Sequence, residues 1–458
     1  MKENQIIIIL FLVLGLFAVY FFSQSSLFQD DIQEQESPPS LLQPINEEIP
    51  ANSNISIQVE PEPIVEDEII LIEDPVVIPN EPSVPVINDK ISKTYSCPKS
   101  TFSPQPNAYL IYDIIGLEQL SVVFGEISGN EINITLSVTN TNSTWFIADL
   151  ESRAIISGPE TTMVQGTVPL FWLPMYYNIG DTITSLGDIE LKVVSEDSMM
   201  FDNNNINTIV VQGTSTLDNG NNKTESIITS YYDKNTGILL QINEQSSTYE
   251  GENLIEQQSI NIINVIETNI NFNSYSIESI SREMTFEFDT FVIYRHDNFN
   301  WKLEFSLIDN SSVNITESRS FFADEWEVIR WRIVDLNCLI IKNSHTTSFD
   351  QASQETPYLL GKSYEFLVRS DLSIGDYILP AYEDIGLGLE VSVFRVVDIR
   401  EFEYNGEIFN VIVAESVGDN GLVRRYFDTL TGIMLLEELE YDGIIRPILS
   451  LQESGIRN

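Results

Sequence analysis

Cysteine and histidine are scarce in this sequence, which holds two of each in 458 residues. A structural zinc site needs about four Cys or His ligands, and neither a Cys-x-x-Cys nor a His-Glu-x-x-His motif occurs. A Ser-His-Asp triad would have to use His296 or His345, and no Gly-x-Ser-x-Gly motif supports one. We expect His296 at a strand end and His345 in a polar loop, and we expect no catalytic residues, no metal and no cofactor.

The two cysteines, Cys97 and Cys338, leave two alternatives open. In an oxidising compartment they could form one disulfide, which would close a long loop and stabilise the fold by up to roughly 5 kcal/mol. Otherwise they are two separate buried thiols.

Basic residues are also few, with 23 Lys and Arg against 69 Asp and Glu and a formal net charge of -46. From residue 91 onward the chain still carries 53 acids and 21 bases. A field of this sign repels phosphate backbones and anionic lipid surfaces. We therefore exclude nucleic acid as a partner and interpret the charge as a contribution to solubility.

Long helical patterns are absent apart from one apolar run at residues 6–22. Its length is near the lower limit for crossing a bilayer. Lys2 precedes it and acidic residues follow it, which favours a cytoplasmic N-terminus and an extracellular bulk. We predict a single-pass signal anchor over residues 1–23; the alternative is a cleaved signal peptide, since Ser23 and Ser25 are small. No cysteine follows closely enough for a lipoprotein anchor.

Residues 24–94 are predicted to be a disordered, acidic, proline-rich tether. Residues 24–90 hold ten of the nineteen prolines, and 15 acids against one base. Proline lacks an N–H and like charges repel, so helix and central strand are both disfavoured.

Beyond the tether the sequence is typical of antiparallel β-sheet. Alternating apolar residues mark strands at Glu131–Thr139, Asn207–Thr216 and Glu407–Glu415. Turn pairs such as Asn405-Gly406 and Asp442-Gly443 suit tight hairpins, because Asn, Asp and Gly tolerate positive φ. One short helix is expected around Gln351–Gln354. The predicted fold class is mainly β, with two related antiparallel domains.

An internal repeat supports that division. Ile179-Gly-Asp181 recurs as Ile374-Gly-Asp376, at an offset of 195 residues. The sequence Asp-x-x-Thr-Gly-Ile recurs at the same offset, and a constant offset between two anchors indicates duplication. We predict domain 1 at 95–275 and domain 2 at 276–458. The repeated residues are interpreted as a structural turn: Asp233, Thr236 and Gly237 in the first copy, and Asp428, Thr431 and Gly432 in the second.

The order Gly-Asp, long strand, then Tyr/Phe-Asp-x-x-Thr-Gly-Ile-x-Leu resembles a module of predicted archaeal membrane-anchored cell-surface proteins. It is loosely similar to the curved sheets of bacterial lipoprotein-carrier-like envelope proteins. The resemblance implies a surface location and a Trp-Pro segment before Gly-Asp. Phe171–Pro174 fits that segment in the first copy, and Pro357–Gly361 fits it in part in the second.

Other candidate sites are less specific. Trp145 and Trp301 are predicted to be core residues, whereas one of Trp326 and Trp331 is expected to be exposed. Asp202–Asn205 is interpreted as a loop, because it lacks calcium-ligand spacing. Six Asn-x-Ser/Thr sequons are potential N-glycosylation sites outside the cytoplasm: Asn54, Asn133, Asn142, Asn222, Asn310 and Asn314.

These features favour a non-catalytic, membrane-anchored cell-surface protein with a structural or interaction role. Its partners would be the membrane through residues 6–22 and an unidentified protein, glycan or lipid-like molecule. One alternative is binding of an apolar ligand on a curved sheet, which requires a cavity above about 300 Å³. A second alternative is a carboxylate-based envelope hydrolase, which requires a cleft with two carboxylates at glycosidase separation.

Overall fold

The computed structural model describes residues 92–454, except 117–118, 140–142, 160–165, 167, 187–188, 219–221, 286–288, 297–298, 322–324, 349–350, 355–360, 380–392 and 419–420. The predicted anchor, residues 1–23, and almost all of the predicted tether lie outside the described residues. Within the described part, no helix is long and apolar enough to cross a membrane. That part is mainly β, as the sequence predicted, and both large sheets are antiparallel.

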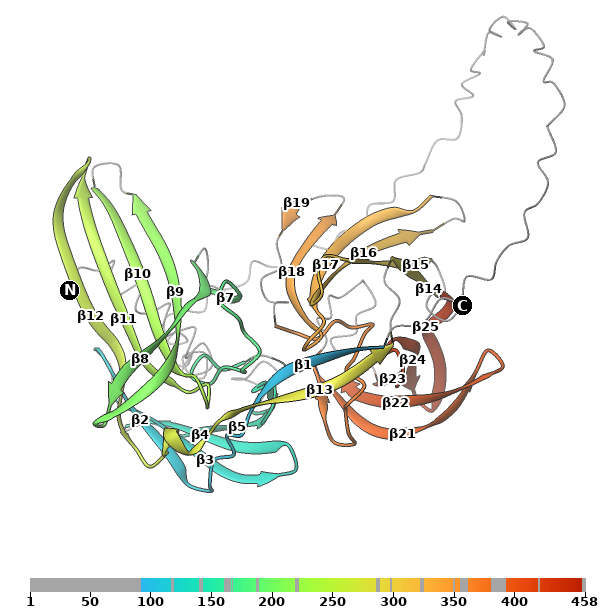
Figure 1. Cartoon of the computed structure of the whole chain (residues 1–458), viewed down its shortest axis with the longest axis horizontal. Helices are drawn as coiled ribbons and strands as arrows, with labels where there is room; N and C mark the ends of the chain where they lie inside the picture. The colour runs from blue at the N-terminus through green and yellow to red at the C-terminus, as the bar shows by residue number, and fades with distance from the viewer. Residues whose placement is uncertain are drawn as a thin grey trace, which may run out of the picture. The chain divides into compact units, whose positions relative to one another are not determined.

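The first sheet contains eleven strands in the order β6-β5-β4-β3-β2-β12-β11-β10-β9-β8-β7 (Figure 1). The chain runs outward as a meander from β2 to β6, crosses over, and returns as a second meander that brings β12 beside β2. The strands are β2 (Ala108–Ile114), β3 (Leu120–Ser128), β4 (Glu131–Val138), β5 (Thr144–Asp149), β6 (Ile155–Ser157), β7 (Thr182–Leu186), β8 (Ile189–Phe201), β9 (Asn204–Asp218), β10 (Asn222–Asp233), β11 (Leu239–Glu250) and β12 (Asn253–Thr268).

The second sheet repeats this topology with one strand more. Its order is β19-β18-β17-β16-β15-β14-β25-β24-β23-β22-β21-β20, so the last strand again lies beside the first of the sheet. The strands are β14 (Thr290–Arg295), β15 (Asn300–Leu307), β16 (Ser312–Ser320), β17 (Glu327–Asp335), β18 (Ile340–Ser348), β19 (Gln351–Gln354), β20 (Tyr377–Ile378), β21 (Phe394–Tyr404), β22 (Glu407–Gly418), β23 (Gly421–Asp428), β24 (Met434–Tyr441) and β25 (Ile444–Ser454).

A separate two-stranded ribbon joins β1 (Ser92–Ser100) to β13 (Ile277–Thr285), each of which precedes one of the two sheets (Figure 1). Ser92 pairs with Thr285 and Ser100 with Ile277, so the pairing is symmetric about its centre. Tyr95 of β1 packs into the core of the second sheet, whereas Ile277 of β13 packs against the core of the first. These contacts cross the domain boundary expected near residue 276.

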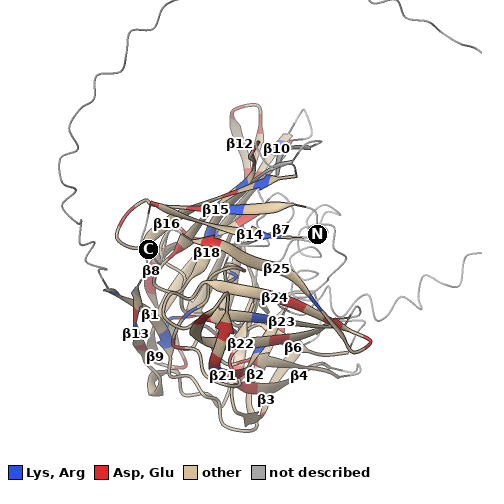
Figure 2. Ribbon diagram, turned by 90° about the vertical axis from the view of Figure 1, so that its right-hand side faces the viewer, with Lys and Arg blue, Asp and Glu red and all other residues tan. Residues whose placement is uncertain are grey.

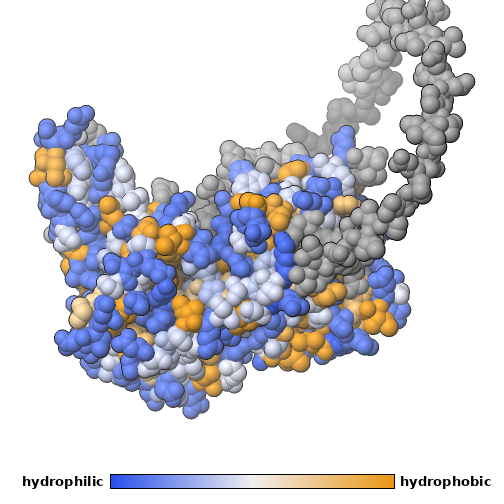
Figure 3. Space-filling model, in the orientation of Figure 1, coloured by the Kyte–Doolittle hydropathy of each residue, from blue (hydrophilic) through white to orange (hydrophobic). Residues whose placement is uncertain are grey.

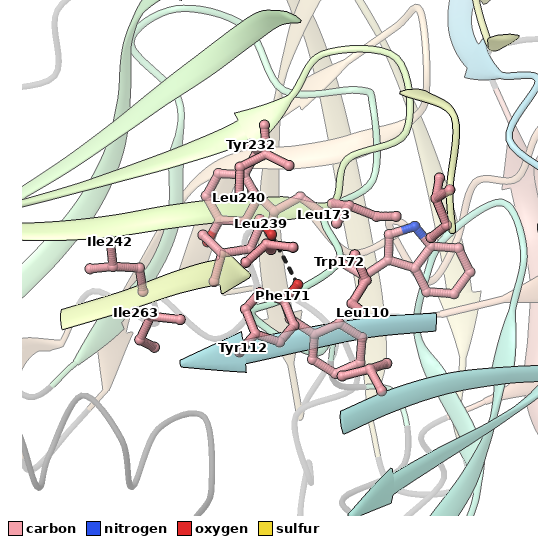
Figure 4. Packing of buried hydrophobic residues seen from close by; sticks show 14 of the residues in the cluster. Leu110, Tyr112, Phe171, Trp172, Leu173, Tyr232, Leu239, Leu240, Ile242 and Ile263 are labelled. Carbon is pink, nitrogen blue, oxygen red and sulfur yellow. Dashed lines mark hydrogen bonds between the residues drawn. The ribbon is translucent and has the colours of Figure 1, made fainter. Parts of the chain in front are cut away.

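Each sheet closes over a central segment that precedes its Gly-Asp turn. In the first sheet, Phe171–Leu173 lies among buried residues of several strands, and Trp172 is fully buried (Figure 4). Phe366, Leu367 and Val368 take the same place in the second sheet, because Phe366 O accepts from Met434 N as Phe171 O does from Leu239 N. Of the predicted counterpart, Pro357–Gly361, only Gly361 lies within the described residues; Leu367 holds the position that Trp172 holds in the first sheet.

Most of the predicted local structure is confirmed. The three quoted strand patterns correspond to β4, β9 and β22. Asn405 and Asp442 have positive φ, each before a glycine with positive φ, and each pair joins two hairpin strands directly. The helix expected at Gln351–Gln354 was wrong, because this segment pairs with β18 as β19. Four residues are too few for helix periodicity to outweigh strand pairing at a sheet edge.

Candidate functional site

The repeated Asp-x-x-Thr-Gly residues form the same hydrogen-bonded turn in both sheets. Asp233 Oδ2 accepts from Thr236 N and Thr236 Oγ1, both at 2.7 Å, and Thr236 Oγ1 accepts from Ile238 N at 3.2 Å. In the second sheet, Asp428 Oδ2 accepts from Thr431 N at 3.2 Å and Thr431 Oγ1 at 2.7 Å. Burial raises the pKa of Asp233, against the hydrogen bonds from Thr236. Both aspartates are buried within the turn they organise.

The glycine of each turn holds the central segment in place. Gly237 has a φ of +77° and Gly432 a φ of +75°, and Gly237 O and Gly432 O accept from Leu173 N and Val368 N, each at 2.9 Å. A side chain on either glycine would collide with the carbonyl oxygen of Leu173 or Val368. This arrangement supports packing rather than ligand binding.

The two cysteines lie at the junction of the two sheets and form a disulfide. Cys97 is on β1, and Cys338 is in the turn between β17 and β18. Both are buried and pack with Ile340. The bond therefore connects a strand that precedes the first sheet to a turn of the second.

Polar contacts surround the disulfide across the same junction. Tyr377 OH donates to Glu131 Oε1 at 2.6 Å, and Tyr176 OH donates to Gly361 O at 2.9 Å. Each Gly-Asp turn forms one contact with the other half of the chain. Asp181 forms an ion pair with Lys342, and Asp376 accepts a hydrogen bond from Asn130. The repeated Gly-Asp aspartates are thus residues that join the two sheets.

Glu151 is the centre of an ion-pair network at this junction. It lies 3.0 Å from Lys99 Nζ and also forms an ion pair with Arg369, which in turn lies 2.8 Å from Asp371. Burial alone would raise the pKa of Glu151, but the charges of Arg369 and Lys99 outweigh it and hold that pKa below its usual value.

A cavity of about 80 Å³ lies beside the disulfide and is lined by Asp149, Glu151, Arg153 and Asp376, among others. Burial raises the pKa of Asp149, so two nearby carboxyls titrate differently. However, Asp149 Oδ2 accepts from Ser152 N at 2.7 Å, and Glu151 is held by two cations. The space accommodates a few water molecules but no sugar ring, so it lacks the cleft that a glycosidase requires.

The interior faces of both sheets are filled by side chains. The first core contains Phe102, Phe124 and Trp172 with edge-to-face ring contacts of 5.5–5.9 Å. The second is built around Trp301, Tyr364 and Phe366. Aromatic side chains, rather than an open apolar surface, therefore lie at the centre of both cores in the part of the chain that the structure describes.

Buried charges in the second sheet were missed by the sequence reasoning. Arg330 lies 2.7 Å from Glu317 and 2.9 Å from Glu365, and Arg332 also forms an ion pair with Glu365. All four side chains are at most 5% exposed. Burial raises the pKa of Glu317, against the two arginines. The signal was the alternation Arg330-Trp-Arg332, which places both arginines on one strand face. Within the described residues, no group of three or more His, Cys, Asp or Glu side chains could hold a metal ion.

The other candidate residues are distributed over both sheets. Trp145 was wrongly assigned to the core, since it is 45% exposed, whereas Trp301 is buried as predicted. His345 lies in β18 and stacks on Trp331 at 5.5 Å, so the predicted loop was also wrong. Asp202 and Asn203 have positive φ in the tight turn between β8 and β9.

The sequons differ in accessibility. Asn133, Asn222 and Asn310 are exposed, and Asn314 is partly exposed on β16. Asn54 and Asn142 lie outside the described residues.

Comparison with known protein families, with curated proteins and with solved structures finds no match to this chain.

Proposed function

We propose that this chain is a membrane-anchored cell-surface protein that displays two related β domains, near 95–275 and 276–458, as one joined unit without catalysis. Its role is structural or one of interaction in the cell envelope. The observation that carries the proposal is the disulfide between Cys97 and Cys338, buried at the junction of the two sheets. Disulfides persist in oxidising compartments and are rare in the cytosol.

Three further features agree with an extracellular location. The apolar run at residues 6–22 has the charge asymmetry of an anchor with a cytoplasmic N-terminus. The proline-rich acidic stretch that follows has the composition of an extended spacer. Acidic side chains are spread over both sheets (Figure 2), which suits a soluble surface and disfavours nucleic acid.

The test is the topology of the full chain in intact cells, with one epitope at each terminus. We expect external protease to remove the C-terminal epitope and to leave the N-terminal epitope intact and in the membrane fraction. A C-terminal epitope that is protected until the cells are permeabilised would contradict the proposal. Recovery of a mature peptide beginning at residue 26 would replace the anchor with a cleaved signal peptide.

A further inference from the structure

A second hollow, of about 480 Å³, lies on the second sheet. It is formed where His296 and Phe299, which lie between β14 and β15, and the end of β16 meet β25, and we call it the aromatic groove. Its volume is within the range of small-molecule sites. None of the residues at the junction of the two sheets lines it.

Aromatic rings form the apolar part of this groove. Phe321 is 50% exposed and Trp326 38% exposed, whereas Phe299 is partly buried 5.9 Å from Phe321. Cations hold both exposed rings: Arg319 lies 4.7 Å from the centre of Phe321, and Lys302 Nζ lies 5.9 Å from that of Trp326. Such contacts between a cation and a ring contribute a modest attraction at exposed sites. On the face drawn in Figure 3, apolar residues form small patches among hydrophilic ones.

Polar groups of several kinds complete the lining. Arg295 supplies donors, Glu453 supplies acceptors, and the amide of Asn300 supplies both. Gln452 Nε2 donates to Ser450, so this side chain offers its carbonyl oxygen as an acceptor. Ser320 also lines the groove, and its buried hydroxyl has no hydrogen-bond partner among the described residues.

The surroundings restrict the kind of ligand. β14 pairs with β15 and β25, and β16 pairs with β15 and β17, so none of the strands described there has a free edge to which an extended peptide could be added. The net charge of -46 disfavours nucleic acids and anionic headgroups. The lining also mixes rings with hydrogen-bonding groups, which an acyl chain does not use.

We propose that the aromatic groove binds a neutral oligosaccharide. A pyranose ring has one face of C–H groups that stacks on an aromatic ring. Its hydroxyls both donate and accept, which matches Arg295, Asn300, Gln452 and Glu453. If the chain is displayed at the cell surface as proposed, this groove gives it a glycan partner. The binding of the oligosaccharide does not depend on where the chain is located.

In the test, the purified, detergent-solubilised full chain is titrated with neutral trisaccharides of glucose, mannose and N-acetylglucosamine. Calorimetry measures the binding. We expect at least one of them to bind, and Trp326→Ala to weaken its binding at least tenfold. Phe321→Ser, which removes a half-exposed ring, serves as the second variant and is expected to weaken binding several-fold. The matched control is Trp145→Ala, which removes an exposed tryptophan of the first sheet and should stay within twofold.

Circular dichroism establishes that each variant is folded, and Phe321→Ser carries the test if Trp326→Ala is not. The proposal is overturned if none of the trisaccharides binds, or if Trp145→Ala weakens binding as much as the groove variants do. Binding only of a heparin tetrasaccharide or of phosphatidylcholine vesicles would overturn it as well. Any of these results leaves the proposed surface display untouched, since that is tested by topology.

Discussion

At the scale of single residues, positive φ and close packing act together in the two Asp-x-x-Thr-Gly turns. The aspartate and threonine close the turn, but the glycine brings the central segment within hydrogen-bonding distance of it. Only a residue without Cβ allows that approach.

We expect Gly237→Ala to lower the free energy of unfolding by about 3 kcal/mol or more, because backbone strain of about 1–2 kcal/mol adds to a collision with Leu173 O. Gly251→Ala is the matched control: its φ is +61°, but a Cβ there meets nothing within 4 Å. Urea unfolding measures both. Equal losses for the two variants would show that the contact with the central segment contributes nothing.

Two fully buried arginines should respond in opposite ways to replacement by leucine. Burial lowers the pKa of Arg153, and its Nε and Nη1 have no hydrogen-bond partner among the described residues. The corresponding turn of the second sheet carries Leu339, also at positive φ. Arg153→Leu should therefore raise stability by about 1 kcal/mol, because it removes a buried charge. Arg332→Leu should lower it by about 3–5 kcal/mol, because Glu317 and Glu365 lose a cation.

Thermal unfolding at neutral pH separates these outcomes. The 4.2 Å contact of the Arg153 guanidinium with the Trp172 ring works against the expected gain. A loss for Arg153→Leu as large as that for Arg332→Leu would show that this contact dominates.

At the scale of elements, each sheet joins its two meanders by pairing its first large strand with its last. In each sheet, at equivalent positions, a buried tyrosine of the first meander forms a hydrogen bond with a strand of the second meander. Tyr112 OH donates to Leu239 O at 2.9 Å (Figure 4), and Tyr294 OH donates to Met434 O at 2.7 Å. Burial raises the pKa of both tyrosines well above the usual value.

We expect Tyr112→Phe and Tyr294→Phe each to destabilise the chain by about 1–2 kcal/mol, because each leaves one buried carbonyl without that hydrogen bond. Because the two tyrosines have equivalent surroundings, the two losses of unfolding free energy should be equal within experimental error. Because the two sites lie in different sheets, the losses should add in the double variant. Tyr249→Phe, on β11 outside both cores, is the control and should be neutral. Chemical denaturation monitored by circular dichroism gives all four values. No loss for Tyr112→Phe or for Tyr294→Phe would contradict the role assigned to these two hydrogen bonds.

At the scale of the whole described unit, the symmetric β1–β13 ribbon and the reciprocal Gly-Asp contacts resemble the self-complementary interface of a two-fold dimer. Here the two copies belong to one chain. The disulfide departs from that symmetry, since the first sheet has Ser152 and Arg153 in the turn that corresponds to Cys338 and Leu339.

The disulfide should contribute strongly to stability, because it closes a loop with a sequence separation of 241 residues. We expect the double variant Cys97→Ser/Cys338→Ser to lose up to roughly 5 kcal/mol, and to retain its sheets because β1 still pairs with β13. Urea unfolding with and without a reducing agent measures the effect. The reductant should lower the midpoint of the wild-type chain and leave that of the double variant unchanged; equal midpoints without reductant would refute the expectation.

The ion-pair network at the junction predicts a defined pH dependence. Since the folded pKa of Glu151 lies below its usual value of 4.5, its contribution is fully present above that value and is lost as the pH falls through the folded pKa. Glu151→Gln should cost about 2 kcal/mol at pH 7, and the cost should shrink below pH 4.5. Asp149→Asn is the control, because burial raises the pKa of Asp149. The change in stability caused by this variant should therefore vary with pH in the opposite direction. A pH-independent cost for Glu151→Gln would contradict this assignment.

The sequence by itself determined the features that depend on near neighbours. Alternation of apolar residues over eight or more positions fixed strands such as β4 and β9, and Asn-Gly or Asp-Gly pairs fixed the hairpins. The internal repeat pointed to one β fold used twice. Such features are local, because side-chain direction alternates at every residue of a strand and positive φ restricts the residue type.

Only the tertiary structure decided which distant residues meet. The sequence left Cys97 and Cys338 either joined or apart, and it gave no reason to place Glu317 and Glu365 around the same arginines. Trp145 lies in the same alternating strand pattern as the buried Trp301 yet is exposed. The aromatic groove draws on residues about 160 positions apart, from Ile293 to Glu453. Burial and contact of this kind depend on how the meanders close and pair, which no local pattern encodes.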